Sequence, residues 1–97
     1  MLRCGTLDLP VSTDAAAQVG IRPEHVGVCG AGEGVGDAEV RVVELLGSET
    51  LVYLDAGGVA LVARLPGMVE ARVGERVGVR VDARRLHRFD AAGTRLT

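Results

Sequence analysis

The sequence predicts an all-β fold, and three observations support this prediction. The apolar residues include 16 valines and 11 leucines but one isoleucine, one tyrosine and one phenylalanine, and β-branched side chains suit a pleated sheet. Apolar and polar residues alternate in several short runs, which is typical of half-buried strands. Turn-forming glycines and prolines separate these runs, and none of the runs has the spacing of an amphipathic helix.

Length and charge narrow the class of protein. The 97 residues predict a single domain over residues 1–97. The formal net charge is -2, so a nucleic-acid-binding surface is not expected. No apolar run approaches the roughly 20 residues of a transmembrane helix, and residues 1–10 lack the apolar core of a signal peptide. Cys4 and Cys29 are too few for a disulfide framework and indicate thiols in a reducing cytoplasm.

The first predicted strand lies within residues 6–11, where Leu7 and Leu9 alternate with polar neighbours. Proline lacks the N–H that a sheet ladder needs, so Pro10 ends this strand. Residues 12–17 are predicted to form a connection, because no periodic pattern follows them.

Residues 20–26, with the sequence GIRPEHV, predict a strand, a corner and a second strand. A residue that precedes proline is held extended, which applies to Arg22. Pro23 presets a tight turn or one turn of 3₁₀ helix that carries Glu24 and His25. The apolar strand pattern resumes directly after this corner.

Residues 30–39, GAGEGVGDAE, are predicted to form a loose, solvent-exposed loop. They do not form a phosphate-binding loop of the Walker A type, because the chain contains no lysine. The dinucleotide pattern GxGxxG also fails, since Val35 stands where the third glycine is required.

Residues 38–46 begin with Val40 and Val42 on one face, and the alternation slips at Val43. A β-bulge, or a strand buried on both faces, would explain this slip.

Residues 50–55 and 59–65 predict a hairpin across an Ala-Gly-Gly loop, and a final short strand is expected at 86–89. With turn signals about every 8–12 residues, the length favours a small OB-fold-like five-stranded barrel with extra short strands. The clearest alternation lies in residues 76–82. It places Val77, Val79 and Val81 inward, and Arg76, Gly78 and Arg80 outward.

Three stretches together resemble a known family: GIRPEHV (20–26), VVELLGSETLVYL (42–54) and RRLHRFDAAGTRL (84–96). They closely resemble the C-terminal TOBE region of ABC-transporter ATP-binding subunits, in the branch that serves maltose, other sugars and glycerol 3-phosphate. The resemblance runs from about Gly5 to Leu96. It implies an OB-fold regulatory domain that follows a nucleotide-binding domain.

The resemblance also implies partners. In the family, two copies of this domain pack together and hold the ATPase dimer, and some members dock cytoplasmic regulators. It implies a non-catalytic module that forms a homodimer, works with an ATPase domain and membrane permease subunits, and lies in the cytoplasm at the inner face of the membrane. The family's ATPase motifs do not occur in these residues, and its usual first barrel strand is expected to precede Met1.

No catalytic, cofactor or metal residue is predicted. His25 and His87 lack a neighbouring nucleophile in the sequence pattern, so they are expected to be packed or surface histidines. Glu44, Glu49 and Asp55 lack the spacing of cation ligands.

A set of polar and turn residues is instead predicted to line a dimer or regulator interface, where arginine is enriched. A structural alternative is that Arg22 pairs with a carboxylate and fixes the corner. The interface set is Arg22, Glu24, Glu44, Gly47, Ser48 and Glu49.

Two other functions remain open at this point. Some TOBE domains bind oxyanions such as molybdate, and the amides and hydroxyls of Gly47 to Thr50 could serve this purpose, although Glu49 opposes an anion. An OB-type nucleic-acid binder would need stacking aromatic residues, and only Tyr53 and Phe89 are available.

Overall fold

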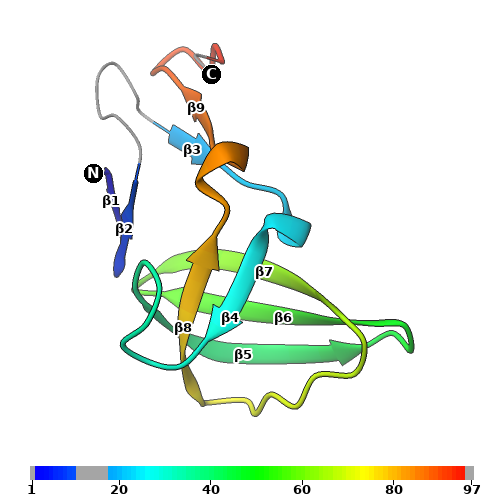
Figure 1. Ribbon diagram of the computed structural model, residues 1–97. Coiled ribbons are helices and arrows are strands. Elements are labelled where there is room, and N and C mark those ends of the chain that lie inside the picture. Colours follow the sequence, from blue (N-terminus) through cyan, green and yellow to red (C-terminus); the bar gives the residue numbers. More distant parts are fainter. Residues whose placement is uncertain (1, 11–17, 96–97) are drawn as a thin grey trace.

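The computed structural model describes residues 2–10 and 18–95, so the connection predicted at 12–17 lies outside the described residues. Five strands form the main sheet: β4 (Val26–Cys29), β5 (Asp37–Leu45), β6 (Glu49–Ala56), β7 (Val59–Pro66) and β8 (Arg76–Val81). All neighbours are antiparallel, in the order β4-β8-β5-β6-β7 (Figure 1). The outer strands β4 and β7 also contact each other, so the sheet closes as the predicted OB-like barrel.

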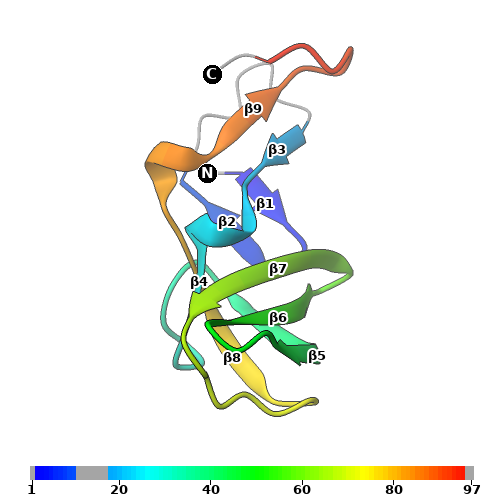
Figure 2. The same cartoon turned by 90° about the vertical axis from the view of Figure 1, so that its right-hand side faces the viewer.

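Short elements gather at one end of the barrel (Figures 1 and 2). Two 3₁₀ turns, η1 (Pro23–His25) and η2 (Ala83–Arg85), stand beside the barrel strands β4 and β8. Four more strands form two antiparallel pairs. The first pair is a hairpin, and the sequence analysis predicted only the second of its two strands. The pairs are β1 (Leu2–Cys4) with β2 (Leu7–Leu9), and β3 (Gln18–Gly20) with β9 (His87–Phe89).

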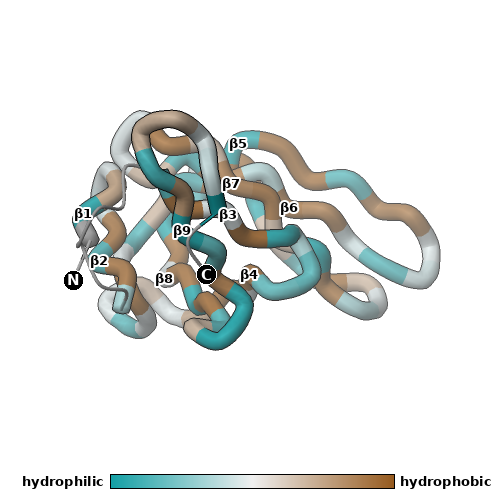
Figure 3. The backbone as a smooth tube through the Cα atoms, turned by 90° about the horizontal axis from the view of Figure 1, so that it is seen from above, coloured by the Kyte–Doolittle hydropathy of each residue, from teal (hydrophilic) through white to brown (hydrophobic). Residues whose placement is uncertain are grey.

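The core lies inside the barrel and beneath β2. Val40, Val52 and Val79 come from three different barrel strands and have no exposed surface. Leu7 of β2 is 2% exposed and closes the end of the barrel. Apolar and polar residues alternate along the barrel strands (Figure 3), so every second side chain of a strand points into the core.

The alternation predicted for β8 is confirmed at most positions. Val77 and Val79 are buried, and Arg76 and Arg80 are exposed. Val81 is half-buried and packs against the core.

The glycine-rich loop predicted at 30–39 is less loose than expected. Residues 30–34 are exposed, but the N–H of Val35 donates to the carbonyl of Val79 over 2.9 Å. A Cβ atom at Gly78 would lie 2.4 Å from two carbonyl oxygens of this loop. Gly78 is therefore buried, and the prediction that it faces outward was wrong because the loop folds over β8.

A β-bulge divides β5 into two halves. The register with β6 shifts between Val40 and Val42, which makes Arg41 the extra residue. Val40 is buried but Val42 is 48% exposed, so the prediction that they share a face was wrong. The irregularity that the sequence indicated at Val43 therefore begins before that residue, and Val43 faces inward beyond it.

The corner was predicted correctly, whereas the hairpin turn is shorter than expected. Arg22 is extended, with φ −81° and ψ 148°, and Pro23 begins η1. Ala56 still pairs within β6, so Gly57 and Gly58 alone form the turn, both at positive φ.

Candidate interaction surface

Glu49 and Arg64 form a two-point ion pair on the outer face of the sheet. Nε of Arg64 lies 2.6 Å from Oε2 of Glu49, and Nη2 lies 3.0 Å from Oε1. The register places Leu51 opposite Arg64, which makes Glu49 a diagonal neighbour of the arginine. The hydrogen bond from Arg64 lowers the pKa of Glu49, so this carboxylate stays charged and oriented.

Glu24 brings a second negative charge toward the same arginine. The turn η1 packs against β7, and a groove of about 410 Å³ there is lined by Glu24 and Arg64. The hydrogen bond with Glu49 raises the pKa of Arg64, and the charge of Glu24 adds to this effect. Two predicted residues, Glu24 and Glu49, thus converge on an arginine that the sequence analysis did not identify.

Arg22 does not join this group. Its side chain is exposed and forms no ion pair or hydrogen bond with any residue in 2–10 or 18–95. Its carbonyl instead accepts the N–H of His25 over 2.9 Å. The expected pairing of Arg22 with a carboxylate is therefore absent there, and its backbone fixes the corner.

An apolar row crosses the outer face beside these charges. Val42, Tyr53 and Val62 are cross-strand neighbours on β5, β6 and β7. Val42 is 48% exposed, and the other two are half-buried. Glu44 lies on the same face, and its carboxylate raises the pKa of Tyr53, chiefly by hydrogen bonding. An outer sheet face is usually polar, so this row is a candidate contact surface.

Some of the groups at the hairpin tip between β5 and β6 that could serve an oxyanion are already engaged, since the N–H of Ser48 donates to the carbonyl of Leu46 over 3.1 Å. Gly47 adopts φ +85°, which suits its predicted role as a turn glycine. The carbonyl of Ser48 accepts the N–H of Gly67 over 2.8 Å. The buried hydroxyl of Thr50 donates to the Gly67 carbonyl over 2.8 Å and accepts the N–H of Val69 over 3.1 Å. This hydroxyl is therefore already used to hold the chain after β7.

Several surface residues escaped the sequence analysis. Arg64 could have been found, since a two-residue glycine turn fixes the register of its hairpin. Leu45 and Met68 are 56% and 64% exposed, and the second lies in a segment without periodicity.

The described part of the chain holds no cluster of three or more His, Cys, Asp or Glu residues that could bind a metal ion. It also holds no helix long and apolar enough to cross a bilayer.

Comparisons with known proteins agree with the geometry. The sequence profile of the TOBE domain matches residues 19–89. The chain is 39% identical over 85 residues to the sn-glycerol-3-phosphate import ATP-binding protein UgpC of Cupriavidus necator, which covers 88% of this chain and 23% of that protein. It is 42% identical over 77 residues to the sulfoquinovosyl glycerol transport ATP-binding protein SmoE of Agrobacterium fabrum, which covers 79% and 22%.

A third relative is named for a different imported compound. The chain is 36% identical over 77 residues to the maltose/maltodextrin import ATP-binding protein MalK of Vibrio vulnificus, which covers 77% of this chain and 21% of that protein. The chain thus spans less than a quarter of the length of these relatives. The family profile covers well over half of the chain and includes the corner and the whole barrel. The chain belongs to the TOBE domain family.

Proposed function

We propose that this domain is the non-catalytic regulatory and dimerisation module of the ATP-binding subunit of an ABC importer of the sugar or glycerol 3-phosphate type. It acts through protein contacts, in the cytoplasm at the inner face of the membrane. Its partners in the complete importer are an ATPase domain, membrane permease subunits and a second copy of itself. A cytoplasmic regulator is a further partner in this proposal.

The observation that carries this proposal is the similarity to importer ATP-binding proteins along 88% of the chain. The relatives are named for the import of glycerol 3-phosphate and of maltose or maltodextrin, and for the transport of sulfoquinovosyl glycerol. The matched part of each relative is its shared TOBE region, so the choice of substrate is not expected to depend on these residues.

The outer sheet face supports the dimerisation part. The row of Val42, Tyr53 and Val62 offers an apolar centre, and the ion pair of Glu49 and Arg64 lies at its margin. Protein interfaces commonly combine an apolar centre with a charged rim, and tyrosine is enriched in them. Identical chains most often associate about a two-fold axis, which would set the same row of each copy together.

A domain exchange tests the importer role. The chain replaces the matching 85 residues of the Cupriavidus necator relative, and substrate-stimulated ATP hydrolysis of the assembled importer is measured. We expect hydrolysis and transport to remain coupled in the chimaera. A chimaera that assembles with the permease but hydrolyses ATP without coupling to substrate would contradict the proposal. The isolated chain should show no saturable binding of ATP and magnesium in a calorimetric titration.

Self-association is tested separately. Sedimentation equilibrium between about 1 and 100 μM should show a dimer, as expected for a modest interface. The substitution Val42→Glu should shift the chain to a monomer, because it places a charge at the centre of the row. Val73→Glu is the matched control, since Val73 is 68% exposed and lies outside the row. A monomer at every concentration would show that the chain does not dimerise by itself.

A further inference from the structure

The second half of β5 has one unpaired edge. On the first half, the N–H of Val40 donates to Glu75 and its carbonyl accepts from Gly74, so both groups point away from β6. Backbone groups alternate in direction along a strand, and the bulge shifts this alternation by one residue. The N–H and C=O groups of Val43 and Leu45 therefore point away from β6. Within residues 2–10 and 18–95, no strand or turn pairs with them.

The alternation is confirmed at the hairpin tip. The N–H of Leu46 donates to the carbonyl of Glu49 over 2.9 Å, toward β6. Residues at even positions beyond the bulge thus bond β6, and those at odd positions face the open edge. The pairing of β5 with β8 stops at Glu39, so β8 does not cover this edge.

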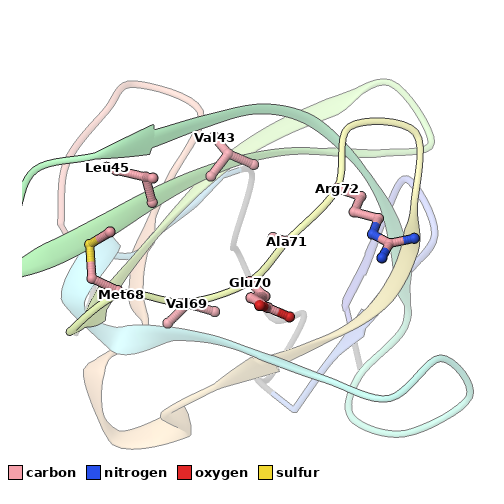
Figure 4. Close-up of a pocket in the computed structure, with 7 residues that line it drawn as sticks. All are labelled: Val43, Leu45, Met68, Val69, Glu70, Ala71 and Arg72. Carbon is pink, nitrogen blue, oxygen red and sulfur yellow. The ribbon is translucent and has the colours of Figure 1, made fainter.

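A groove runs along the open edge. The chain between β7 and β8 passes beside β5 and leaves a cavity of about 500 Å³, which Figure 4 shows between the strand and this segment. Val43 and Leu45 line one side, and Met68, Val69, Glu70 and Ala71 line the other. Leu45 and Met68 are more than half exposed, so the groove presents apolar surface to solvent.

Both ends of the far wall are fixed. The hydroxyl of Thr50 holds Gly67 and Val69 near the hairpin tip. Gly74 and Glu75 are bonded to Val40 at the other end, with N···O distances of 2.7 and 2.9 Å. The groove therefore exists before anything binds, which lowers the entropic cost of binding.

The charges at the groove favour one pattern of occupant. Arg72 lies at the end nearest the bulge and has no ion pair with any carboxylate in the described ranges. Glu44 stands between Val43 and Leu45 and points to the opposite face of the strand. An added strand would thus meet apolar side chains at two positions of β5 with the carboxylate of Glu44 between them. The far wall adds the carboxylate of Glu70, and the guanidinium of Arg72 lies at one end.

We propose that this groove binds an extended peptide of a partner protein, which adds to β5 as an antiparallel strand. Every neighbouring pair in the sheet is antiparallel, so the peptide runs from the Leu45 end toward Arg72. Its recognised pattern is apolar, basic, apolar, acidic: the first three residues lie opposite Leu45, Glu44 and Val43, and the acidic residue follows at the end where Arg72 lies. Backbone bonds to Val43 and Leu45 supply affinity, and the side chains supply specificity. This site is separate from the outer face proposed for dimerisation.

The open edge is tested first in the free chain. Amide hydrogen exchange followed by NMR should show Val43 and Leu45 exchanging at least about tenfold faster than Val42 and Glu44, because only the even positions bond β6. Equal protection at all four amides would mean that the edge is already covered, and the proposal would be lost.

Binding is tested with one probe, an acetylated and amidated hexapeptide of threonine-leucine-lysine-valine-aspartate-threonine. Saturable NMR shifts should appear at Val43, Leu45 and Val69, with slower exchange of the first two amides. N-methylation of the peptide's valine removes an amide that faces β5 and should weaken binding about tenfold or more. N-methylation of its lysine changes an amide that faces away and should have little effect.

The charge at the groove end gives a second comparison. Arg72→Glu should weaken the binding of the hexapeptide. Replacing the aspartate of the hexapeptide by lysine should restore binding to this variant. Arg84→Glu is the control, because Arg84 belongs to η2, which lies far from the segment between β7 and β8 (Figure 1). No saturable shift up to about 1 mM, a weak-binding limit, would overturn the proposal, and so would equal binding of the two N-methylated peptides.

Discussion

The two halves of β5 differ although they belong to one strand. Before the bulge, β5 pairs on both edges, and its inward residue Val40 has no exposed surface. Beyond the bulge it pairs on one edge, and Leu45 is 56% exposed. The first half lies in the closed barrel under β2, whereas the second half projects with the β6 hairpin (Figure 1). Stability is thus expected to depend on the closed part and binding on the projecting part.

The largest effect is expected in the closed part. Val79→Asp buries an unpaired charge at a position with no exposed surface, and the whole stability of a small domain is about 5–15 kcal/mol. We expect loss of the cooperative unfolding transition in circular dichroism. Val73→Asp is the control, because this residue is 68% exposed. A cooperative transition within a few degrees of the parent for Val79→Asp would show that β8 does not form the core.

A smaller loss is expected where β2 closes the barrel. Leu7→Ala leaves a cavity at a residue that is 2% exposed and should lower the free energy of unfolding by about 2–5 kcal/mol. Leu45→Ala, in the projecting half, should change it by about 0.5 kcal/mol or less. Urea unfolding of both variants measures the contrast directly. Equal losses would remove the distinction between the two halves.

Thr50 lies opposite Leu45 in the projecting part but is fully buried, so its effect should be intermediate. Thr50→Val leaves the Gly67 carbonyl and the Val69 N–H without their partner, which should cost about 1–3 kcal/mol. Hydrogen exchange should also accelerate at Val69 while the barrel amides stay protected. Ser48→Ala serves as the comparison, because Ser48 is exposed and contributes through its backbone. Unchanged exchange at Val69 would show that the hydroxyl does not fix the groove wall.

The smallest effect concerns the ion pair on the outer face. In the folded chain, the hydrogen bond with Arg64 lowers the pKa of Glu49 below its ordinary value of 4.5. The ion pair therefore stabilises the fold fully when the pH is above the pKa that Glu49 has in the unfolded chain. This stabilisation is lost as the pH falls through the lower pKa that Glu49 has in the folded chain. Glu49→Gln should remove this part of the acid dependence, measured by urea unfolding between about pH 2 and about pH 7. Arg64→Gln should remove the same part, because it takes away the partner that lowers the pKa of Glu49.

Local sequence was sufficient where a residue restricts its own backbone. Pro23 predicted the corner because proline fixes its own φ and keeps Arg22 extended. The valines of β8 predicted the core face, because alternation alone orients a regular strand. The same reasoning failed at Val42, since a bulge reverses the alternation and depends on the partner strand.

Features that depend on distant contacts were not predictable. Gly78 is buried by a loop more than forty positions earlier in the chain, a contact that no local pattern indicates. Among the predicted interface residues, Glu24 and Glu49 meet only through Arg64, whose role required the register of a hairpin. Arg22 was selected by its place in a motif, and its guanidinium makes no contact that supports the selection within the described ranges.

The bulge also marks where the gene can change length without changing the product's architecture. Deletion of the single codon for Arg41 would restore a regular strand, with Val42 still outward and Val43 still inward. The surface ion pairs of Arg41 with Glu39 and Asp55 would be lost, and such exposed pairs contribute little. A one-residue deletion elsewhere in β5 would instead reverse every side chain beyond it. Tolerance of insertions and deletions along this strand should therefore be concentrated at one position.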